Sequence, residues 1–219
     1  MYFEDARKAM VDSQLAPNGI TDSKILDAFS TLPRELFLPD AYQRTCYKDE
    51  DINLPNGRAV LDPLTLAKLI SAADIQEHDV ILCIGDISGY AAAILSKLAT
   101  TIIRLEEDHH ALSFSEEIYE NADIINIVSI QQKLSDGDMA HAPFNKIILC
   151  GASTLKPQHL IKQLSDDGAL CYVHKNNPMT LGAIKKIKKV GASEHIEETI
   201  GMSATAYCLG YESEKAFAL

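Results

Sequence analysis

The stretch that decides the fold is Val80-Ile81-Leu82-Cys83-Ile84-Gly85-Asp86-Ile87-Ser88-Gly89-Tyr90. Its first five residues form an uninterrupted apolar run, which is typical of a strand covered on both faces of a sheet. Gly85 and Gly89 allow a tight turn, and the alanine-rich residues 89–98 that follow predict a helix. A strand that turns directly into a helix is the unit from which parallel sheets are built.

The same alternation continues toward the C-terminus. Further strands are predicted at residues 101–105, 124–130, 146–150 and 168–174, helices at 108–121 and 157–164, and β-hairpins beyond Leu181. Repeated strand–helix units predict an α/β fold: a mostly parallel sheet with helices on both faces.

The first third of the chain predicts helices instead of strands. One stripe at helical spacing runs through Phe3, Ala6, Met10 and Gln14, and an apolar face at the same spacing runs through Ile25, Leu26, Phe29 and Leu32. Thr21 or Asp22 is expected to cap the second of these helices, and Asp62-Pro63 to begin a third at residues 64–73. A polar, acidic loop is expected at residues 47–57. We therefore predict one domain over residues 1–219, with 1–73 as a helical cap and substrate-side segment and 74–219 as a Rossmann-like core.

Composition excludes several classes of partner. The 219 residues carry 31 acidic and 20 basic side chains, a formal net charge of -11. Such a surface repels phosphate backbones and anionic lipid, so neither nucleic acid nor a membrane is an expected partner. The start of the chain lacks the pattern of a secretion signal, and the five cysteines are scattered without a CxxC pair. We expect a cytoplasmic protein without a metal site, since His109 and His110 have no partner at ligand spacing.

A cofactor site is predicted where the first strand of the alternating region ends. Ligands of open α/β sheets bind beyond the carboxyl ends of the strands, and Glu106 stands there, 21 positions after Gly85. An acidic side chain at this place can accept hydrogen bonds from a ribose diol, which favours an adenosine-type cofactor. The alternative is a plain strand-to-helix turn followed by acidic residues that cap a helix. A nicotinamide-dependent oxidoreductase is disfavoured because the glycine spacing of a dinucleotide loop is absent.

The sequence resembles the protein-L-isoaspartate O-methyltransferase family over nearly its whole length. The segments that carry the resemblance are Met10-Val11-Asp12-Ser13-Gln14-Leu15, Pro33-Arg34-Glu35-Leu36-Phe37-Leu38-Pro39, Ile84 to Tyr90, Ala142-Pro143-Phe144-Asn145-Lys146-Ile147-Ile148 and Asp167-Gly168-Ala169-Leu170. The resemblance implies a class I methyltransferase fold that binds S-adenosylmethionine and methylates a protein or peptide carboxylate, starting the repair of isoaspartyl residues. The tail resembles a variant branch of the family, with a short strand at residues 216–219.

The resemblance also assigns a site. The implied cofactor-binding residues are Gly85, Asp86, Ile87, Ser88, Gly89, Tyr90, Glu106, Lys133 and Leu134. Catalysis of this kind depends mainly on positioning, because a carboxylate is already nucleophilic, and no side chain is assigned a catalytic role.

This chain departs from the family pattern at several of these positions. Ala59 and Leu61 stand where the family has substrate-binding hydroxyls, and Ile87 replaces the middle glycine of the cofactor loop. Gln132-Lys133-Leu134 replaces the segment that faces adenine, and Cys83 replaces an acidic residue. These departures favour an alternative function: a degenerate, catalytically inactive protein that keeps the fold and acts by binding.

Overall fold

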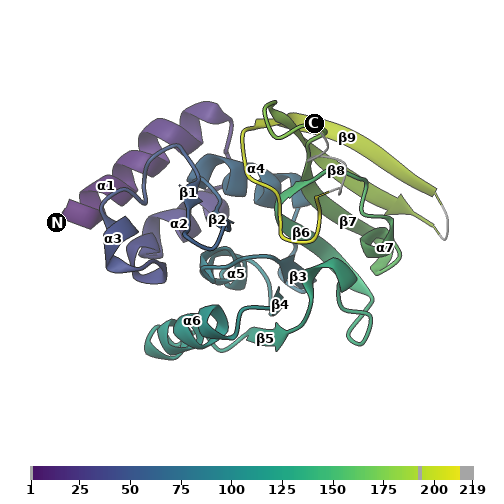
Figure 1. Ribbon diagram of the computed structural model, residues 1–219, viewed down its shortest axis with the longest axis horizontal. Helices are drawn as coiled ribbons and strands as arrows, with labels where there is room; N and C mark the ends of the chain where they lie inside the picture. The colour runs from purple at the N-terminus through teal and green to yellow at the C-terminus, as the bar shows by residue number, and fades with distance from the viewer. Residues whose placement is uncertain (1, 192–193, 213–219) are drawn as a thin grey trace.

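A seven-stranded sheet in the order β5-β4-β3-β6-β7-β8-β9 runs through the computed structural model, which describes residues 2–191 and 194–212 (Figure 1). Its strands are β3 (Val80–Ile84), β4 (Thr101–Glu106), β5 (Ile127–Gln131), β6 (Phe144–Ser153), β7 (Leu164–His174), β8 (Gly182–Val190) and β9 (Glu194–Ser203). The pairings from β5 to β7 are parallel, and β8 and β9 are antiparallel. The predicted mostly parallel sheet and C-terminal hairpin are confirmed.

The helical and short elements come mainly before and between these strands. They are α1 (Tyr2–Met10), η1 (Val11–Leu15), η2 (Ala16–Asn18), α2 (Ser23–Thr31), η3 (Arg34–Phe37), α3 (Asp40–Gln43), β1 (Ile52–Asn53), β2 (Ala59–Val60), α4 (Pro63–Ala73), α5 (Tyr90–Ser96), α6 (His109–Asn121), η4 (Leu134–Asp136) and α7 (Gln158–Ile161). Two predicted caps are confirmed: the Asp22 carboxylate accepts from the backbone N–H of Lys24, and that of Asp62 from Thr65.

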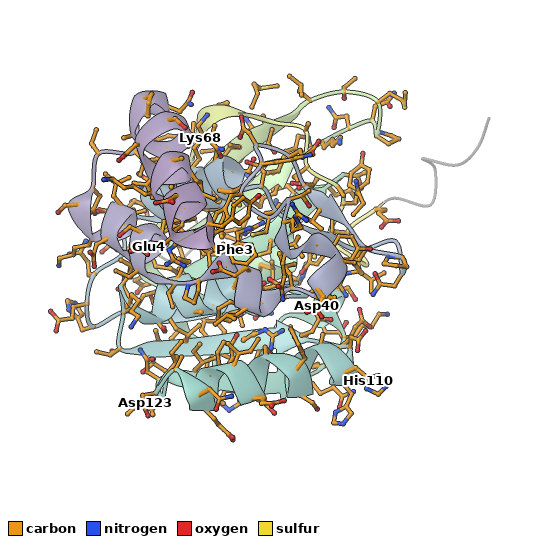
Figure 2. The ribbon with its side chains drawn as sticks, turned by 90° about the vertical axis from the view of Figure 1, so that its left-hand side faces the viewer. Phe3, Glu4, Asp40, Lys68, His110 and Asp123 are labelled. Carbon is orange, nitrogen blue, oxygen red and sulfur yellow. The ribbon has the colours of Figure 1, made fainter. Side chains whose placement is uncertain are left out.

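The two faces of the sheet are covered unequally. One face packs against α4, α5 and the N-terminal helices in a large apolar cluster, which α6 joins through Tyr119. Figure 2 shows α6 as a separate layer, with His110 and Asp123 at its ends and the N-terminal helices with Phe3 and Glu4 above it. The other face holds a smaller cluster whose cover comes from the short α7, η4 and the residues Cys208 and Tyr211. On this face Cys208 and Tyr211 therefore provide part of the cover that helices provide on the first face.

Several predicted boundaries are wrong. The helix predicted at residues 157–164 spans only Gln158–Ile161, because Leu164 already pairs with Phe144 and begins β7. The expected loop at 47–57 contains β1, which pairs with β2. The strand predicted from residue 124 begins at Ile127, after a turn at Asp123 with φ 52°. The strand expected at 216–219 lies outside the described residues.

None of the helices in the described part of the chain has the length and apolar character that a membrane span requires.

Candidate functional site

The turn after β3 is built by the carboxylate of Asp86. This carboxylate accepts from the backbone N–H of Gly89 at 3.0 Å, from the Ser88 hydroxyl at 3.0 Å and from the N–H of Ala92 at 2.9 Å. A side chain that satisfies the free N–H groups at the start of α5 fixes the path of the turn. The predicted strand, turn and helix unit is confirmed, although the helix ends at Ser96 instead of residue 98.

The inner side of the turn rests on buried polar groups from β4 and α6. The Arg104 guanidinium donates to the carbonyl of Asp86 at 2.8 and 3.2 Å and to the Ser115 hydroxyl at 2.5 Å. The Tyr119 hydroxyl donates to the carbonyl of Gly89 at 2.7 Å. Burial raises the pKa of Tyr119, which keeps this hydroxyl protonated as a donor.

Glu106 lies at the end of β4, as predicted, but its carboxylate is already bound within the chain. Arg58, which directly precedes β2, donates from Nη1 to Oε1 at 3.0 Å and from Nη2 to Oε2 at 2.8 Å. Arg58 Nη2 also donates to the carbonyl of Gly85 at 3.3 Å. Burial lowers the pKa of Arg58, but the hydrogen bonds and the charge of Glu106 outweigh burial and raise it overall. The Arg58 guanidinium therefore bridges Glu106 and the Gly85 turn, which the sequence analysis placed next to each other.

Glu106 lies beside the Gly85 turn, as predicted, but the described residues leave only a small cavity next to that turn. The Glu106 side chain is 0% exposed. The cavity beside Gly85 has a volume of about 10 Å³, which is about the space that one water molecule requires. The reason is that the side chains of this chain fill the space.

Three of the family-pattern departures line this small cavity. Ala59, Leu61 and Ile87 all face it, and they contribute only apolar side chains. The side chain of Arg34 lies beside them and donates to the carbonyl of Leu61 at 2.6 Å. Where the family pattern has hydroxyls, at positions 59 and 61, this lining has only the side chains of Ala59 and Leu61. Asp62, the next residue, is engaged as the cap of α4.

The expected adenine side is also covered. Lys133 is exposed, while Leu134 is fully buried with its Cδ1 atom 3.5 Å from the place that a Cβ on Gly85 would take. The carbonyl of Leu134 accepts a hydrogen bond from the Tyr211 hydroxyl at 3.0 Å. Cys208 lies closer still, since a Cβ on Gly85 would be 2.5 Å from its Sγ atom. Cys208 and Leu134 therefore occupy the space directly beside Gly85.

Sequence reasoning missed Arg58, Cys208 and Tyr211. Arg58 stands in the segment Gly57-Arg58-Ala59, next to a position that the family pattern marks for substrate, so an extra charge there was a usable signal. Cys208 and Tyr211 gave no such signal, because only the folded chain brings Cys208 to Gly85 and Tyr211 to Leu134. No cluster of three His, Cys, Asp or Glu side chains that could hold a metal occurs among residues 2–191 and 194–212.

Comparisons with known proteins extend the sequence resemblance. Residues 5–204 match the family model described as protein-L-isoaspartate(D-aspartate) O-methyltransferase. A protein-L-isoaspartate O-methyltransferase from Herpetosiphon aurantiacus is 34% identical over 169 residues, which cover 77% of this chain and 75% of the relative. Another with that name, from Desulfotalea psychrophila, is 29% identical over 90% of this chain and 91% of the relative.

Solved structures agree on the fold. One described as a protein-L-isoaspartate O-methyltransferase matches with a TM-score of 0.78 at 18% identity, over 94% of this chain and 66% of that one. A putative member from Plasmodium falciparum, solved in complex with S-adenosyl-L-homocysteine, matches with a TM-score of 0.74 at 16% identity, over 92% of this chain and 97% of that one. The predicted class I, Rossmann-like methyltransferase fold is confirmed.

Proposed function

Because this chain belongs to the protein-L-isoaspartate(D-aspartate) O-methyltransferase family, we propose that it methylates a carboxylate of a protein or peptide with S-adenosylmethionine as methyl donor. The family is a class of enzymes that use this cofactor, and one structural neighbour was solved with the demethylated product. The isoaspartyl carboxylate is the acceptor that the family name supplies, and the cytoplasm is the proposed place of action.

One observation supports this proposal most: Glu106 is retained at the tip of β4, within hydrogen-bonding distance of the guanidinium that also contacts the Gly85 carbonyl. A carboxylate beside the turn after β3 is what a ribose diol requires. The proposed cofactor-binding residues are Gly85, Asp86, Ile87, Ser88, Gly89, Tyr90, Glu106, Lys133 and Leu134. Residues 1–73 would supply the substrate side and residues 74–219 the cofactor side of one domain.

The activity requires an arrangement other than the closed one. Arg58 would have to release Glu106, and the chain around Cys208 would have to leave Gly85, before a nucleoside could enter. Once both partners are bound, little acid–base chemistry is needed, since positioning of the acceptor carboxylate carries most of the rate.

The proposal is tested by titration calorimetry with S-adenosylmethionine and S-adenosylhomocysteine, followed by transfer of tritiated methyl groups to an isoaspartyl peptide. A peptide of the same sequence with a normal aspartyl linkage is the control. Micromolar binding and transfer that depends on the isoaspartyl linkage are expected. Heat with neither ligand at near-millimolar concentration, together with no transfer, would contradict it.

A second function is favoured by the bidentate pair of Arg58 and Glu106 and by the apolar side chains at Ala59, Leu61 and Ile87. These features suit a protein that keeps the methyltransferase fold, does not use the cofactor and acts by binding another molecule. The same calorimetry decides between the two, because only the enzyme requires cofactor affinity.

A further inference from the structure

The chain that follows β9 returns across the sheet to the site instead of leaving the molecule. Residues 204–211, here called the closing segment, run beside the end of β6: the N–H of Ala152 donates to Ala206 O at 2.8 Å, and the N–H of Cys208 donates to Ala152 O at 2.9 Å. The N–H of Thr154 donates to Tyr211 O at 2.9 Å. Figure 1 shows this part of the chain in yellow, looping beside β6. The closing segment thus adds a short parallel strand-like piece at the carboxyl end of β6, where ligands of such sheets bind.

The closing segment is pressed against glycine positions of the site. A Cβ on Gly85, which has φ 78°, would lie 2.5 Å from Cys208 Sγ, and one on Gly151, with φ 151°, would lie 2.7 Å from the Cys208 backbone N. Contacts this close exclude any third group between the closing segment and the strand ends. Cys208 itself is 3% exposed.

Two charged side chains fasten the beginning of the closing segment. The Asp51 carboxylate accepts from the Thr205 hydroxyl at 2.6 Å and from the Ala206 N–H at 3.0 Å. Lys175 Nζ donates to the carbonyls of Ala204 at 3.1 Å and Thr205 at 2.9 Å. Hydrogen bonds to charged groups are stronger than those between neutral groups. These four hydrogen bonds, here called the latch, therefore hold residues 204–206 in place.

Solvent reaches the outer side of the closing segment. A surface groove of about 580 Å³ runs past Ala206 and Tyr207, and another of about 470 Å³ runs past Gly210 and Tyr211. The closing segment is therefore a single layer of chain between water and the Gly85 turn. Lifting it away would break the hydrogen bonds at Asp51 and Lys175 and the pairing to β6, and would uncover the smaller apolar cluster to which Cys208 and Tyr211 belong.

We propose that the closing segment and Arg58 form an intramolecular plug that occupies the nucleoside part of the site and moves away together to admit a ligand. Arg58 binds the carboxylate of Glu106, and Cys208 covers Gly85. The plug competes with the cofactor's adenosine, and in this respect the inference rests on the proposed function.

The experiment uses one variant at each end of the plug. Arg58→Gln removes the guanidinium from Glu106, and Thr205→Val removes one hydrogen bond of the latch at Asp51. Arg44→Gln, at an exposed arginine, and Thr31→Val, on α2, are the matched controls. Affinity for S-adenosylhomocysteine is measured by calorimetry, and the alkylation rate of Cys208 by iodoacetamide is followed at pH 8 by peptide mapping, with Cys171 as internal reference.

Both plug variants are expected to bind S-adenosylhomocysteine about tenfold more tightly than the unmodified chain and to raise the ratio of the Cys208 rate to the Cys171 rate at least tenfold, while both controls keep the affinity and the ratio of the unmodified chain. Equal affinity and equal Cys208 rates in all five proteins would overturn the plug and leave the proposed function standing. Faster Cys208 alkylation in both variants without binding at near-millimolar ligand would support the movable plug and overturn the proposed use of the cofactor.

Discussion

The two sides of the turn at residues 85–90 are covered in different ways. On the inner side, Arg104, Ser115 and Tyr119 hold the carbonyls of Asp86 and Gly89 with buried hydrogen bonds. On the outer side, where a ligand would lie, Arg58 and Cys208 from distant parts of the chain fill the space. The inner side of the turn is thus firmly held, while the surface that we propose for the cofactor is covered by the protein itself. Closure does not come from collapse of the turn.

The largest expected effect comes from breaking the outer-side ion pair. Arg58→Met leaves Glu106 buried without its cation, and an unpaired buried charge costs about 3–5 kcal/mol. We expect the free energy of unfolding in urea to fall by about that amount. The double variant Arg58→Met with Glu106→Leu removes both charges and should recover most of the loss. A single-variant loss below about 1 kcal/mol would mean that Glu106 is not sealed from water.

Ile87 tests whether crowding adds to the plug. In the Arg58→Gln background, Ile87→Gly should tighten the binding of S-adenosylhomocysteine by about another tenfold, equivalent to about 1.4 kcal/mol, because the branched side chain lines the cavity beside Gly85. Ile87→Val, which keeps the branch, is the matched control. Calorimetry that gave one dissociation constant for all three proteins would refute the crowding account of the loop.

Two buried tyrosines near the turn, Tyr90 and Tyr119, form a matched pair. The Tyr119 hydroxyl donates to the carbonyl of Gly89, whereas the buried Tyr90 hydroxyl has no hydrogen-bond partner among the residues that the structure describes. Tyr119→Phe should lower the free energy of unfolding by about 1 kcal/mol, the net worth of a hydrogen bond, and Tyr90→Phe should leave it within about 0.5 kcal/mol. Urea denaturation measures both. A larger loss for Tyr90→Phe than for Tyr119→Phe would reverse the assignment of which hydroxyl supports the turn.

The thiol over Gly85 gives the smallest effect, a difference in alkylation rate between the folded and the unfolded chain. Burial raises the pKa of Cys208 to about 12, and alkylation requires the thiolate. Between pH 7 and 9, Cys208 in the folded chain should therefore react far more slowly than in urea, where its thiol titrates near the ordinary value. Rapid alkylation of the folded chain at pH 8 would show that Cys208 is already free of Gly85.

The framework was predictable because its signals are local. The apolar run before Gly85 and the carboxylate of Asp62 before Pro63 each determine structure within a few residues, and both predictions held. Glu106 was placed correctly for the same reason, since the end of a parallel strand lies at a known edge of the sheet. The end of α7 was misjudged because the pairing of Leu164 with Phe144 overrides helical periodicity.

The filling of the site was not predictable in this way. Arg58 and Glu106 are 48 positions apart. Cys208 contacts Gly85 because the chain beyond β8 and β9 turns back to β6. Nothing in the periodicity around Cys208 marks it as a neighbour of the turn. The family resemblance pointed toward a cofactor-binding enzyme, and the departures at Ala59, Leu61 and Ile87 toward a degenerate protein that acts by binding. The structure adds Arg58 and Cys208, which fill the space beside Gly85.

The most direct test is a crystal structure of the unmodified chain grown with saturating S-adenosylhomocysteine. The account predicts a nucleoside hydrogen-bonded to Glu106, with the Arg58 guanidinium turned away and Cys208 withdrawn from Gly85. A nucleoside bound there while the Arg58–Glu106 pair stays intact and Cys208 still touches Gly85 would contradict it.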